Sequence, residues 1–557
     1  MEFREPGWWQ HGVIYQIYPL TFADSNGDGL GDLRGIIQRL DYLNDGNPDS
    51  QSSLGIDAIW LSPIYQSPMV DNGYDVSDYY DICPTFGSLD DFKQLVSEAH
   101  GRNIKIILDL VVNHTSNQHP WFIESSRSRD NPKHDWYLWL DPAPDGGVPN
   151  NWIAYFGGPG WTFNEDRQQY YYHTFNANQP DLNWRHPEVR KAVYDLMRFW
   201  LDLGVDGFRL DASSTYSKDE LFRDNPVKFE ATDRKDYNNQ YHLYNKNLPE
   251  NHYIIQDMRA VLEEYDERVL IGETFIDSRL YDSIIFHGVD NNELHLPLTF
   301  EFALSPWYPG YIQREIEKKE LITPPEAWPA YFFDNHDLPR HLSRWIDCSL
   351  CIDSEAIAKA AATLLLTVRG TPILYYGEEI GMVNHEDIPP EMAKDEVVIG
   401  NIDGEVIPSR DGTRTPMQWD NSPQAGFSFG QDVEPYLPVN DNVKTINVAT
   451  QIQDENSIWH FYRQLIQVHR NNEALHRGSW RSLIHYPYEH LAYLRQTDQQ
   501  TVLVLINFSY EKALTTDEPI PQDYWQVLLS TSHHKGDKIK SPQRLQGFEI
   551  SILAALD

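Results

Sequence analysis

The sequence predicts a (β/α)8 barrel with a domain inserted after the third strand and an antiparallel β-domain at the C-terminal end. Eight short apolar runs alternate with segments of helical periodicity, a pattern typical of parallel strands that close into a barrel. After the third run the periodicity lapses into Trp-, Tyr-, Pro- and Gly-rich sequence, and a connection of that length needs structure of its own. Near the C-terminal end, short alternating runs follow one another without long helices. We therefore predict a barrel of residues 1–112 and 185–477, an inserted domain of residues 113–184 and a C-terminal β-sandwich of residues 478–557.

The predicted strands are apolar throughout, as strands of a parallel sheet covered on both faces should be. Predicted helices separate several of them, and strand, helix, strand at this spacing favours parallel pairing. The strands are predicted at residues 12–18, 55–61, 104–112, 204–211, 269–273, 294–300, 330–333 and 372–376. The helices are predicted at residues 88–101, 186–203, 253–264 and 457–470.

The fourth predicted strand ends in a pair of opposite charges. Val205, Phe208 and Leu210 supply its apolar content. Arg209 and Asp211 fall on one face of this strand, because side chains alternate between its two faces. Parallel-strand barrels keep their chemistry at the carboxyl ends of the strands. Asp211 is therefore the first candidate for a catalytic carboxylate.

Composition excludes several classes of function. With 41% hydrophobic residues among 557, the chain has ample material for a packed core and is not a disordered or fibrous protein. Its 83 acidic and 45 basic residues give a formal charge of -38, which argues against nucleic acid and anionic membrane surfaces as partners. No apolar run is long enough to span a bilayer and the N-terminus lacks a signal-peptide pattern, so we expect a cytoplasmic location.

Three cysteines, Cys83, Cys348 and Cys351, predict no disulfide framework. The last two have the spacing of a redox pair, but the surrounding sequence has no thioredoxin-like pattern. Chance spacing is the simpler explanation.

An Asp-rich loop follows the first predicted strand. Side-chain oxygens recur there at every second position and glycines allow a tight curl, as a hard divalent cation requires. The candidate ligands are Asp24, Asn26, Asp28 and Asp32 through their side chains and Leu30 through its carbonyl oxygen. The EF-hand pattern fails, because Gly35 occupies the position of its final Glu. A solvated, Asx-rich turn explains the same residues, so two interpretations stand at this point.

Three carboxylates occupy equivalent positions at the ends of predicted strands. Asp211 follows the fourth strand, Glu273 the fifth and Asp337 the seventh. In a barrel these ends converge on one face, where His114 and His336 would join them. Cleavage of a glycosidic bond needs two carboxyl groups, one as nucleophile or base and one as proton donor. The pattern therefore favours a glycosidase over a cluster of helix caps or solvated acids.

Six short segments together resemble one enzyme family. They are DLVVNH at residues 109–114, QPDLN at 179–183, GFRLD at 207–211, GE at 272–273, NHD at 335–337 and RDGTRTPMQW at 410–419. In this order they resemble the α-amylase superfamily of retaining glycoside hydrolases (glycoside hydrolase family 13), in its α-glucosidase and oligo-1,6-glucosidase branch. The resemblance implies a retaining α-glucosidase on a barrel with an inserted domain.

The resemblance also implies roles for the three acids. Asp211 would be the nucleophile, Glu273 the general acid/base, and Asp337 the carboxylate that holds sugar hydroxyls and favours the distorted transition state. Arg209, on the face of Asp211, would keep that carboxylate ionised. The remaining implied sugar ligands are His114 and His336, which would bind hydroxyls of the reacting glucose.

Further residues match family positions around the sugar. Tyr74 would stack on the reacting glucose, and Asp75 would grip its far hydroxyls with Arg414 as ionic partner. Such a clamp closes the non-reducing side and implies exo-cleavage of one glucose from short oligosaccharides or glucosides. The Asp-rich loop matches the single cation site of the branch, which implies structural Ca2+ or Mg2+; no organic cofactor is implied.

The residue after the nucleophile bears on linkage. Val at this position resembles 1,6-acting relatives, whereas Ala or Thr resembles 1,4-acting ones, so Ala212 favours α-1,4 bonds or compact substrates such as sucrose. Three alternatives remain: a transglycosidase or isomerase with the same triad, a sucrose- or α-1,6-specific hydrolase, and a non-catalytic sugar-binding or transporter-associated relative. The last predicts missing acids, and all three acids are present.

Overall fold

The computed structural model of the chain describes residues 7–229, 231, 236–274, 284–345, 353–395, 409–430, 433–514 and 516–556. Cys348 and Cys351 lie outside these residues. Cys83 is buried, and its thiol is free.

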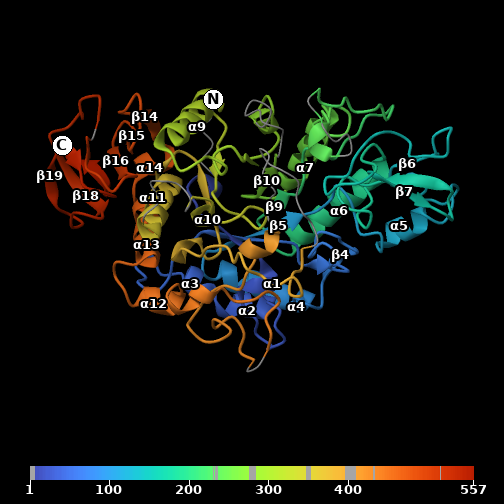
Figure 1. Cartoon of the computed structure of the whole chain (residues 1–557), viewed down its shortest axis with the longest axis horizontal. Coiled ribbons are helices and arrows are strands. Elements are labelled where there is room, and N and C mark those ends of the chain that lie inside the picture. Colours follow the sequence, from blue (N-terminus) through green and yellow to red (C-terminus); the bar gives the residue numbers. More distant parts are fainter. Residues whose placement is uncertain are drawn as a thin grey trace.

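Eight parallel strands form one sheet that curls into a nearly closed barrel (Figure 1). Their order is β11-β10-β9-β5-β2-β1-β13-β12. At the two ends of the sheet, Cα atoms of β11 and β12 come within 8 Å of each other. The strands are β1 (Ile14–Ile17), β2 (Ala58–Leu61), β5 (Lys105–Leu110), β9 (Gly207–Leu210), β10 (Val269–Glu273), β11 (Leu296–Leu298), β12 (Ala330–Tyr331) and β13 (Thr371–Tyr375). Ile14 of β1 is in register with Ala58 on one side and with Ile373 on the other. The predicted fold class is confirmed.

Most strands are shorter than the apolar runs that predict them. β10 coincides with its run, whereas β12 ends at Tyr331. Phe332 and Phe333 beyond it remain buried, because the chain still packs against the core after its last ladder hydrogen bond.

Helices alternate with the barrel strands and form the outer layer (Figure 1). Around the barrel they are α1 (Pro19–Phe22), α2 (Leu33–Gln38), α3 (Leu40–Leu43), α4 (Leu89–His100), α6 (Pro187–Asp202), α7 (Glu250–Leu262), α9 (Pro309–Ile322), α10 (His341–Trp345), α11 (Ser354–Thr367), α12 (Val448–Ile452), α13 (Ile458–Asn471) and α14 (Glu473–Arg477). Local sequence fixes their starts. Ser88 and Asp91 form a reciprocal capping box on α4, and Pro187 occupies the first turn of α6.

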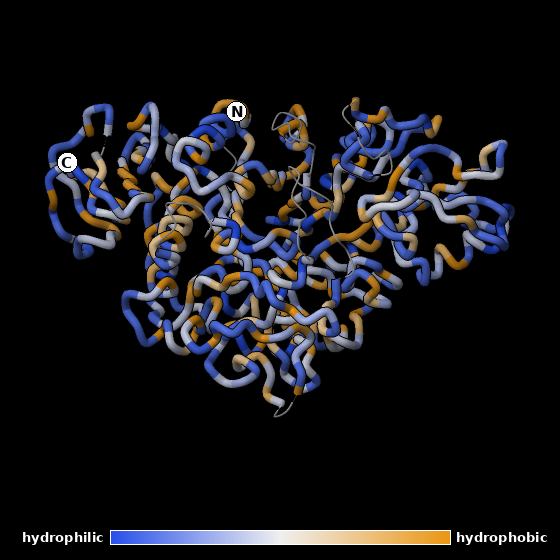
Figure 2. Tube along the Cα trace, viewed as in Figure 1, coloured by the Kyte–Doolittle hydropathy of each residue, from blue (hydrophilic) through white to orange (hydrophobic). Residues whose placement is uncertain are grey.

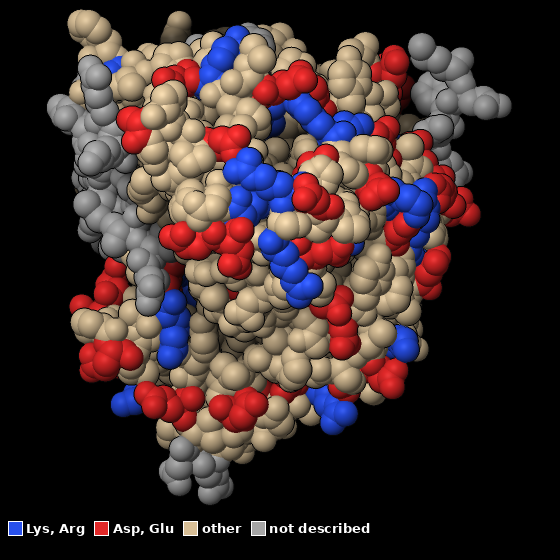
Figure 3. Space-filling view, turned by 90° about the vertical axis from the view of Figure 1, so that its right-hand side faces the viewer, with Lys and Arg blue, Asp and Glu red and all other residues tan. Residues whose placement is uncertain are grey.

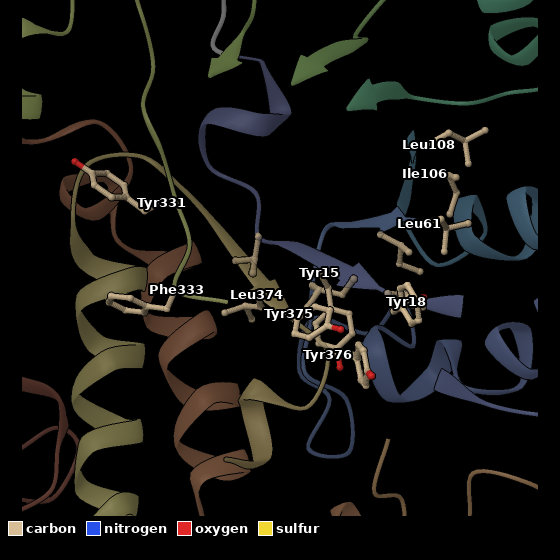
Figure 4. Packing of buried hydrophobic residues seen from close by; sticks show 14 of the residues in the cluster. Tyr15, Tyr18, Leu61, Ile106, Leu108, Tyr331, Phe333, Leu374, Tyr375 and Tyr376 are labelled. Atoms are coloured by element: carbon tan, nitrogen blue, oxygen red, sulfur yellow. The ribbon is translucent and has the colours of Figure 1, made fainter. Parts of the chain in front are cut away.

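The barrel strands bury side chains on both faces, which explains their continuous apolar runs. Along β1, Ile14 packs inside the barrel with Ile107 and Ile271, and Tyr15 packs outward with the helices. Tyr15, Leu374 and Tyr375 lie close together in the outer layer (Figure 4). Hydrophobic and hydrophilic residues alternate along the trace in all parts of the molecule (Figure 2).

The segment between β5 and β9 projects from the barrel (Figure 1, right). It contains α5 (Pro120–Ser125) and a three-stranded sheet in the order β6-β8-β7, made of β6 (Trp139–Leu140), β7 (Trp161–Asn164) and β8 (Gln169–Tyr172). A hairpin of β3 (Tyr65–Gln66) and β4 (Asp78–Ile82) leaves the barrel after β2. Trp152, Trp161 and Tyr172 form a core of this segment's own.

An antiparallel sheet lies at the opposite end of the molecule (Figure 1, left). Its order is β14-β15-β16-β21-β18-β19, and β17 pairs separately with β20. These strands are β14 (Ser479–Ser482), β15 (His490–Gln496), β16 (Thr501–Asn507), β17 (Ala513–Leu514), β18 (Tyr524–Ser530), β19 (Lys538–Lys540), β20 (Arg544–Leu545) and β21 (Ile550–Ala555). The exact domain limits stay predictions.

Acidic and basic side chains are interspersed over the face that carries the inserted segment (Figure 3). Within the described residues, no helix combines the length and the apolarity that crossing a bilayer requires.

Candidate active site

A pocket of about 980 Å³, its open mouth included, lies at the carboxyl ends of the barrel strands. All three predicted acids line it: Asp211 follows β9, Glu273 ends β10 and Asp337 follows β12. Four other predicted site residues line it too, namely Tyr74, His114, Ala212 and His336. The convergence of strand ends thus brings together groups that are far apart in sequence.

The guanidinium of Arg209 joins the two acids that glycoside cleavage requires. Its Nη1 lies 2.9 Å from Oδ1 of Asp211, and its Nη2 lies 2.8 Å from Oε2 of Glu273. Arg209 is 1% exposed, so both contacts form away from bulk water. Alternation along β9 puts Arg209 and Asp211 on one face, as the sequence predicts.

Each of these acids lines the pocket and has one oxygen that does not contact Arg209. Oε2 of Glu273 also accepts a hydrogen bond from the backbone N–H of Ala212 at 3.2 Å, so its occupied oxygen is well defined. Among the described residues, neither Oε1 of Glu273 nor Oδ2 of Asp211 has a hydrogen-bond donor. These two oxygens are therefore available to a substrate.

A third carboxylate, Asp109 at the end of β5, shares the same guanidinium. Its Oδ1 lies 2.8 Å from Nη1 of Arg209, and its Oδ2 accepts hydrogen bonds from the hydroxyl of Tyr74 and the indole of Trp60. Burial raises the pKa of Asp109 to about 6, against the effect of Arg209. The sequence places Asp109 in a family motif but gives it no role.

The crowding of acids alters the expected charge on Asp211. Burial raises its pKa well above the usual range, Arg209 lowers it, and Glu273 and Asp109 raise it further. One guanidinium serves three carboxylates here, so the expectation that Arg209 alone keeps Asp211 ionised is incomplete. A proton on the buried carboxyl group of Asp109 would relieve part of the repulsion on Asp211.

Asp337 has the opposite electrostatic setting. Its Oδ1 lies 3.0 Å from Nη2 of Arg414 and 3.1 Å from Nη1 of Arg410, and its Oδ2 lies 3.0 Å from Nε2 of His336. Although burial acts against them, these three groups lower the pKa of Asp337 well below its usual range. Asp337 is thus held as a carboxylate.

The predicted ion pair between Asp75 and Arg414 is wrong. Asp75 is fully buried and accepts hydrogen bonds from the Ser67 hydroxyl and from the backbone of Val70 and Asp71. Its carboxylate thus closes a turn of its own loop and does not line the pocket. Arg414 is bound to Asp337 instead.

Asp71 and Arg410 form the ion pair that lines the pocket. Nη2 of Arg410 lies 3.2 Å from Oδ1 of Asp71, and both residues face the cavity. Asp395 holds the same guanidinium through two contacts of 2.8 and 2.9 Å, and Gln179 donates to Oδ2 of Asp71 at 2.9 Å. Asp71 and Arg410 stand four positions before Asp75 and Arg414, the residues predicted to form the pair. Residue type and spacing alone do not distinguish the two pairs.

The two histidines are locked by neighbouring groups. Nε2 of His114 lies 2.9 Å from the carbonyl oxygen of Tyr74. The ring of Tyr74 stacks on His336 with centroids 5.3 Å apart, and Nδ1 of His336 lies 2.8 Å from Nε2 of Gln16. Burial lowers the pKa of His336 to about 3, so this ring is neutral at ordinary pH.

Aromatic side chains that the sequence did not single out form much of the pocket wall. Tyr155, Phe156 and Phe175 come from the inserted segment, whereas Phe300 follows β11. Aromatic faces suit the apolar faces of sugar rings. The Trp- and Tyr-rich composition of residues 113–184 was the available signal, but it does not indicate which rings face inward.

The Asp-rich loop is buried at its two ends. Asp24 is fully buried, and its oxygens accept from the backbone of Asn26, Gly27 and Gly29. Asp32 caps α2 through the N–H of Gly35. Neither carboxylate forms an ion pair with the part of the chain that the structure describes. The loop is thus an Asx-rich turn whose oxygen donors also suit a hard cation.

A second cluster of possible ligands lies outside the residues that line the pocket. One atom each of Asp334, His341 and Glu378 lie within 4.8 Å of one another, and all three residues are buried. Nδ1 of His341 is bound to Asp334, and Oε1 of Glu378 accepts from the hydroxyl of Tyr462. Arg344 approaches Asp334 to 3.8 Å, so this cluster carries its own cation.

The family model for the alpha amylase catalytic domain matches residues 16–478, which include the whole pocket. The chain belongs to this family. The predicted resemblance to glycoside hydrolase family 13 is confirmed.

Two curated relatives show the range of activities close to this family 13 chain. It is 40% identical over 561 residues to an oligo-1,6-glucosidase of Heyndrickxia coagulans, covering 95% of this chain and 96% of the relative. It is 36% identical over 566 residues to a trehalose-6-phosphate hydrolase of Bacillus subtilis, covering 95% of each.

Solved structures extend that range to transfer reactions. A trehalulose synthase from Pseudomonas mesoacidophila is 35% identical with a TM-score of 0.86, covering 99% of this chain and 100% of that one. The isomaltulose synthase of Protaminobacter rubrum is 34% identical with the same TM-score and the same coverage. The chain is therefore an enzyme of the glucosidase and transglycosidase group of family 13.

Proposed function

We propose that the protein is a retaining, exo-acting α-glucosidase that releases glucose from the non-reducing end of short α-glucosides. The observation that carries the proposal is the single guanidinium of Arg209, which contacts both Asp211 and Glu273. A retaining pair of carboxyl groups stands about 5 to 5.5 Å apart, and two acids on one guanidinium fit that requirement.

In the first step, Oδ2 of Asp211 attacks the anomeric carbon of the bound glucose. Oε1 of Glu273 gives its proton to the glycosidic oxygen, and the bond between that oxygen and the anomeric carbon breaks. The products are a glucosyl ester of Asp211 and the free leaving group. The contacts of Arg209 and Ala212 with Oε2 leave Oε1 as the proton-carrying atom.

In the second step, the carboxylate of Glu273 removes a proton from a water molecule, and the water oxygen attacks the anomeric carbon. The ester bond to Asp211 breaks, so glucose leaves with its original anomeric configuration. Asp337, held as a carboxylate by two guanidiniums, is placed to accept hydrogen bonds from glucose hydroxyls.

The ion pair of Asp71 and Arg410 supports exo-cleavage. It lines the pocket and is fixed by Asp395 and Gln179, so it can bind terminal hydroxyls. An ion pair that binds the terminal hydroxyls would block the extension of the substrate beyond that glucose. We propose α-1,4 linkages or compact disaccharides as substrates, because Ala212 presents only a methyl group beside the two acids.

Glucosyl transfer is a second candidate. It is favoured by the similarity to trehalulose and isomaltulose synthases and by the aromatic wall, which can hold an acceptor sugar in place of water. The two candidates share the first step and differ in the group that attacks the ester.

We also propose that the Asp-rich loop binds structural Ca2+ or Mg2+ through Asp24, Asn26, Asp28, Leu30 and Asp32. Support comes from its oxygen donors and from two buried carboxylates without an ion pair among the described residues. When bound, the cation would offset this negative charge and stiffen the turn that leads from β1 to α2.

Incubation with maltose, isomaltose, sucrose and trehalose, followed by chromatography of the products and NMR of the anomers, tests the proposal. The α-anomer of glucose from maltose or sucrose is the expected product. Rearranged disaccharides would establish transfer, and the absence of any reaction would refute both candidates.

A further inference from the structure

The loop that follows Asp211 carries a lysine enclosed by the protein. Lys218 is 4% exposed, and the three N–H groups of its ammonium face three acceptors. These are Oδ2 of Asp181 at 2.5 Å, Oδ1 of Asn113 at 3.0 Å and the carbonyl oxygen of Thr215. Burial lowers the pKa of Lys218, and Asp181 opposes that shift. The set of acceptors therefore suits a charged, fully satisfied ammonium.

The lysine determines which way the amide of Asn113 points. An ammonium group only donates hydrogen bonds, so the Asn113 atom that faces it must be the carbonyl oxygen. The hydroxyl of Thr215 lies 3.0 Å from the same oxygen. The amide nitrogen of Asn113 then faces Nδ1 of His114 at 3.2 Å.

That amide nitrogen determines the proton on His114. An NH2 group also only donates, so Nδ1 of His114 must accept and carries no proton. The other ring nitrogen, Nε2, faces the carbonyl oxygen of Tyr74 at 2.9 Å and must donate. A reversed Asn113 would instead present its oxygen to Nδ1 and stabilise the imidazolium.

We propose that Lys218 is a positioning residue for the reaction: through Asn113, it holds His114 as the neutral imidazole with its proton on Nε2. The inference deepens the proposed function and rests on it for its effect on rate. His114 lines the glucose pocket, and positive charge develops on the sugar in the transition state. A second cation at His114 would oppose that charge.

The charged groups around His114 do not all act in one direction. Burial lowers its pKa; Asp181 and Asp71 favour the imidazolium; Lys218 disfavours it. Asp181 pairs with His114 in a β-bridge and Asp71 lies at the pocket, so the acids alone would attract a proton. Lys218 neutralises Asp181 and orients Asn113 at the same time.

The direct test observes the imidazole by NMR of protein with 15N-labelled histidine, with the His114 signal assigned by its loss in His114→Gln. In the unmodified protein we expect the Nε2–H tautomer and no titration from pH 8 to pH 5. Lys218→Met with Asp181→Asn removes both buried charges together and takes away the donor that orients Asn113. The amide of Asn113 can then reverse and present its oxygen to Nδ1, so His114 should titrate within this range. An Nδ1–H tautomer in the unmodified protein, or an unchanged spectrum in the double variant, would overturn the proposal.

A matched control is Lys191→Met with Asp195→Asn, which removes an exposed ion pair on α6 and should leave His114 unchanged. Asn113→Asp decides the case if the double variant does not fold, because a carboxylate accepts from both Lys218 and Nδ1–H. It should produce the imidazolium with Lys218 in place, and a neutral His114 in this variant contradicts the proposal.

Kinetics add a second readout. In the double variant, kcat at pH 5 should fall about tenfold further, relative to pH 7, than in the unmodified protein, while KM changes little. A parallel loss at both pH values would indicate a purely structural role. Because the tautomer is read without substrate, failure of the proposed function would leave the NMR result intact.

Discussion

The backbone N–H of Ala212 lies 3.2 Å from Oε2 of Glu273. The residue after the proposed nucleophile therefore contacts the proposed acid/base directly through its backbone. The φ of Ala212 is +45°, in the left-handed region, where the backbone of residues other than glycine is strained. Any substitution at this position changes both the shape of the sugar pocket and the support of Glu273.

Replacement of Ala212 should separate these effects. Ala212→Val puts a β-branched side chain at positive φ and should lower the free energy of unfolding by about 1–3 kcal/mol. Ala212→Gly should leave stability nearly unchanged, because relief of strain offsets the greater freedom of the unfolded chain. Denaturant unfolding measures both, and equal stability of the valine variant would show that position 212 is not strained.

Glu273→Gln tests the proton donor. Without an ionisable group at Oε1, kcat for maltose should fall by about 10²–10⁴-fold. A glucoside with a nitrophenolate leaving group needs little protonation, so formation of the glucosyl ester from it should be much less affected. Asp211→Asn should abolish turnover of both substrates. If Glu273→Gln left the turnover of maltose unchanged, the proton would have to come from another group.

The correction of the clamp gives a matched pair of variants. Asp71→Asn should lower kcat/KM about 10–100-fold through loss of one charge-assisted hydrogen bond to the sugar, with an unchanged melting temperature. Asp75→Ala removes the acceptor of three buried donors and should cost about 1–3 kcal/mol of stability. Kinetics and thermal unfolding of the two variants check the assignment of Asp71 to sugar binding and of Asp75 to the loop. A stability loss with Asp71→Asn and a loss of kcat/KM alone with Asp75→Ala would exclude it.

Lys319 predicts a dependence of stability on alkaline pH. This buried ammonium donates to Thr299 and to the carbonyl of Ala330, and burial lowers its pKa to about 8. Above that pH the folded state loses the proton, while the unfolded chain keeps it up to a pKa of about 10.4. The folded state binds fewer protons in this window, so the contribution of Lys319 to stability rises with pH, by about 3 kcal/mol in total.

Lys319→Met removes this titration. The difference in unfolding free energy between the two proteins, measured from pH 7 to pH 10.5, should therefore change in favour of the unmodified protein. A difference that stays constant over this range would show that Lys319 keeps an ordinary pKa in the fold.

Removal of divalent cations tests the Asp-rich loop. With Ca2+ at about 100 times its dissociation constant, the folded state gains about 2.7 kcal/mol, so chelation should lower the melting temperature by about 2 °C. Asp28→Asn should abolish this dependence, because Asp28 is a proposed ligand that lies on the surface. Equal melting curves with chelator and with Ca2+ or Mg2+ would identify the loop as a turn only.

The sequence by itself determined the barrel and the strand-end acids. Short apolar runs have the length expected of buried strands, and they predict that Asp211, Glu273 and Asp337 stand at strand ends. The strand ends of a barrel converge on one face. These are local properties, because a side chain next to a strand end is carried to the edge of the sheet by the backbone alone.

Only the tertiary structure decided which neighbouring charges meet. Asp71 and Asp75 stand in one loop and Arg410 and Arg414 in one motif, so residue type fits either pairing. The turn that binds Asp75 to Val70 and Asp71 removes it from the pocket and leaves Asp71 to face Arg410. Arg209 contacts Asp109 and Glu273, and Lys218 contacts Asn113, although these partners stand about 60 to 105 positions apart in sequence. Contacts over such sequence separations depend on the packing of the whole fold and cannot be predicted from a local pattern.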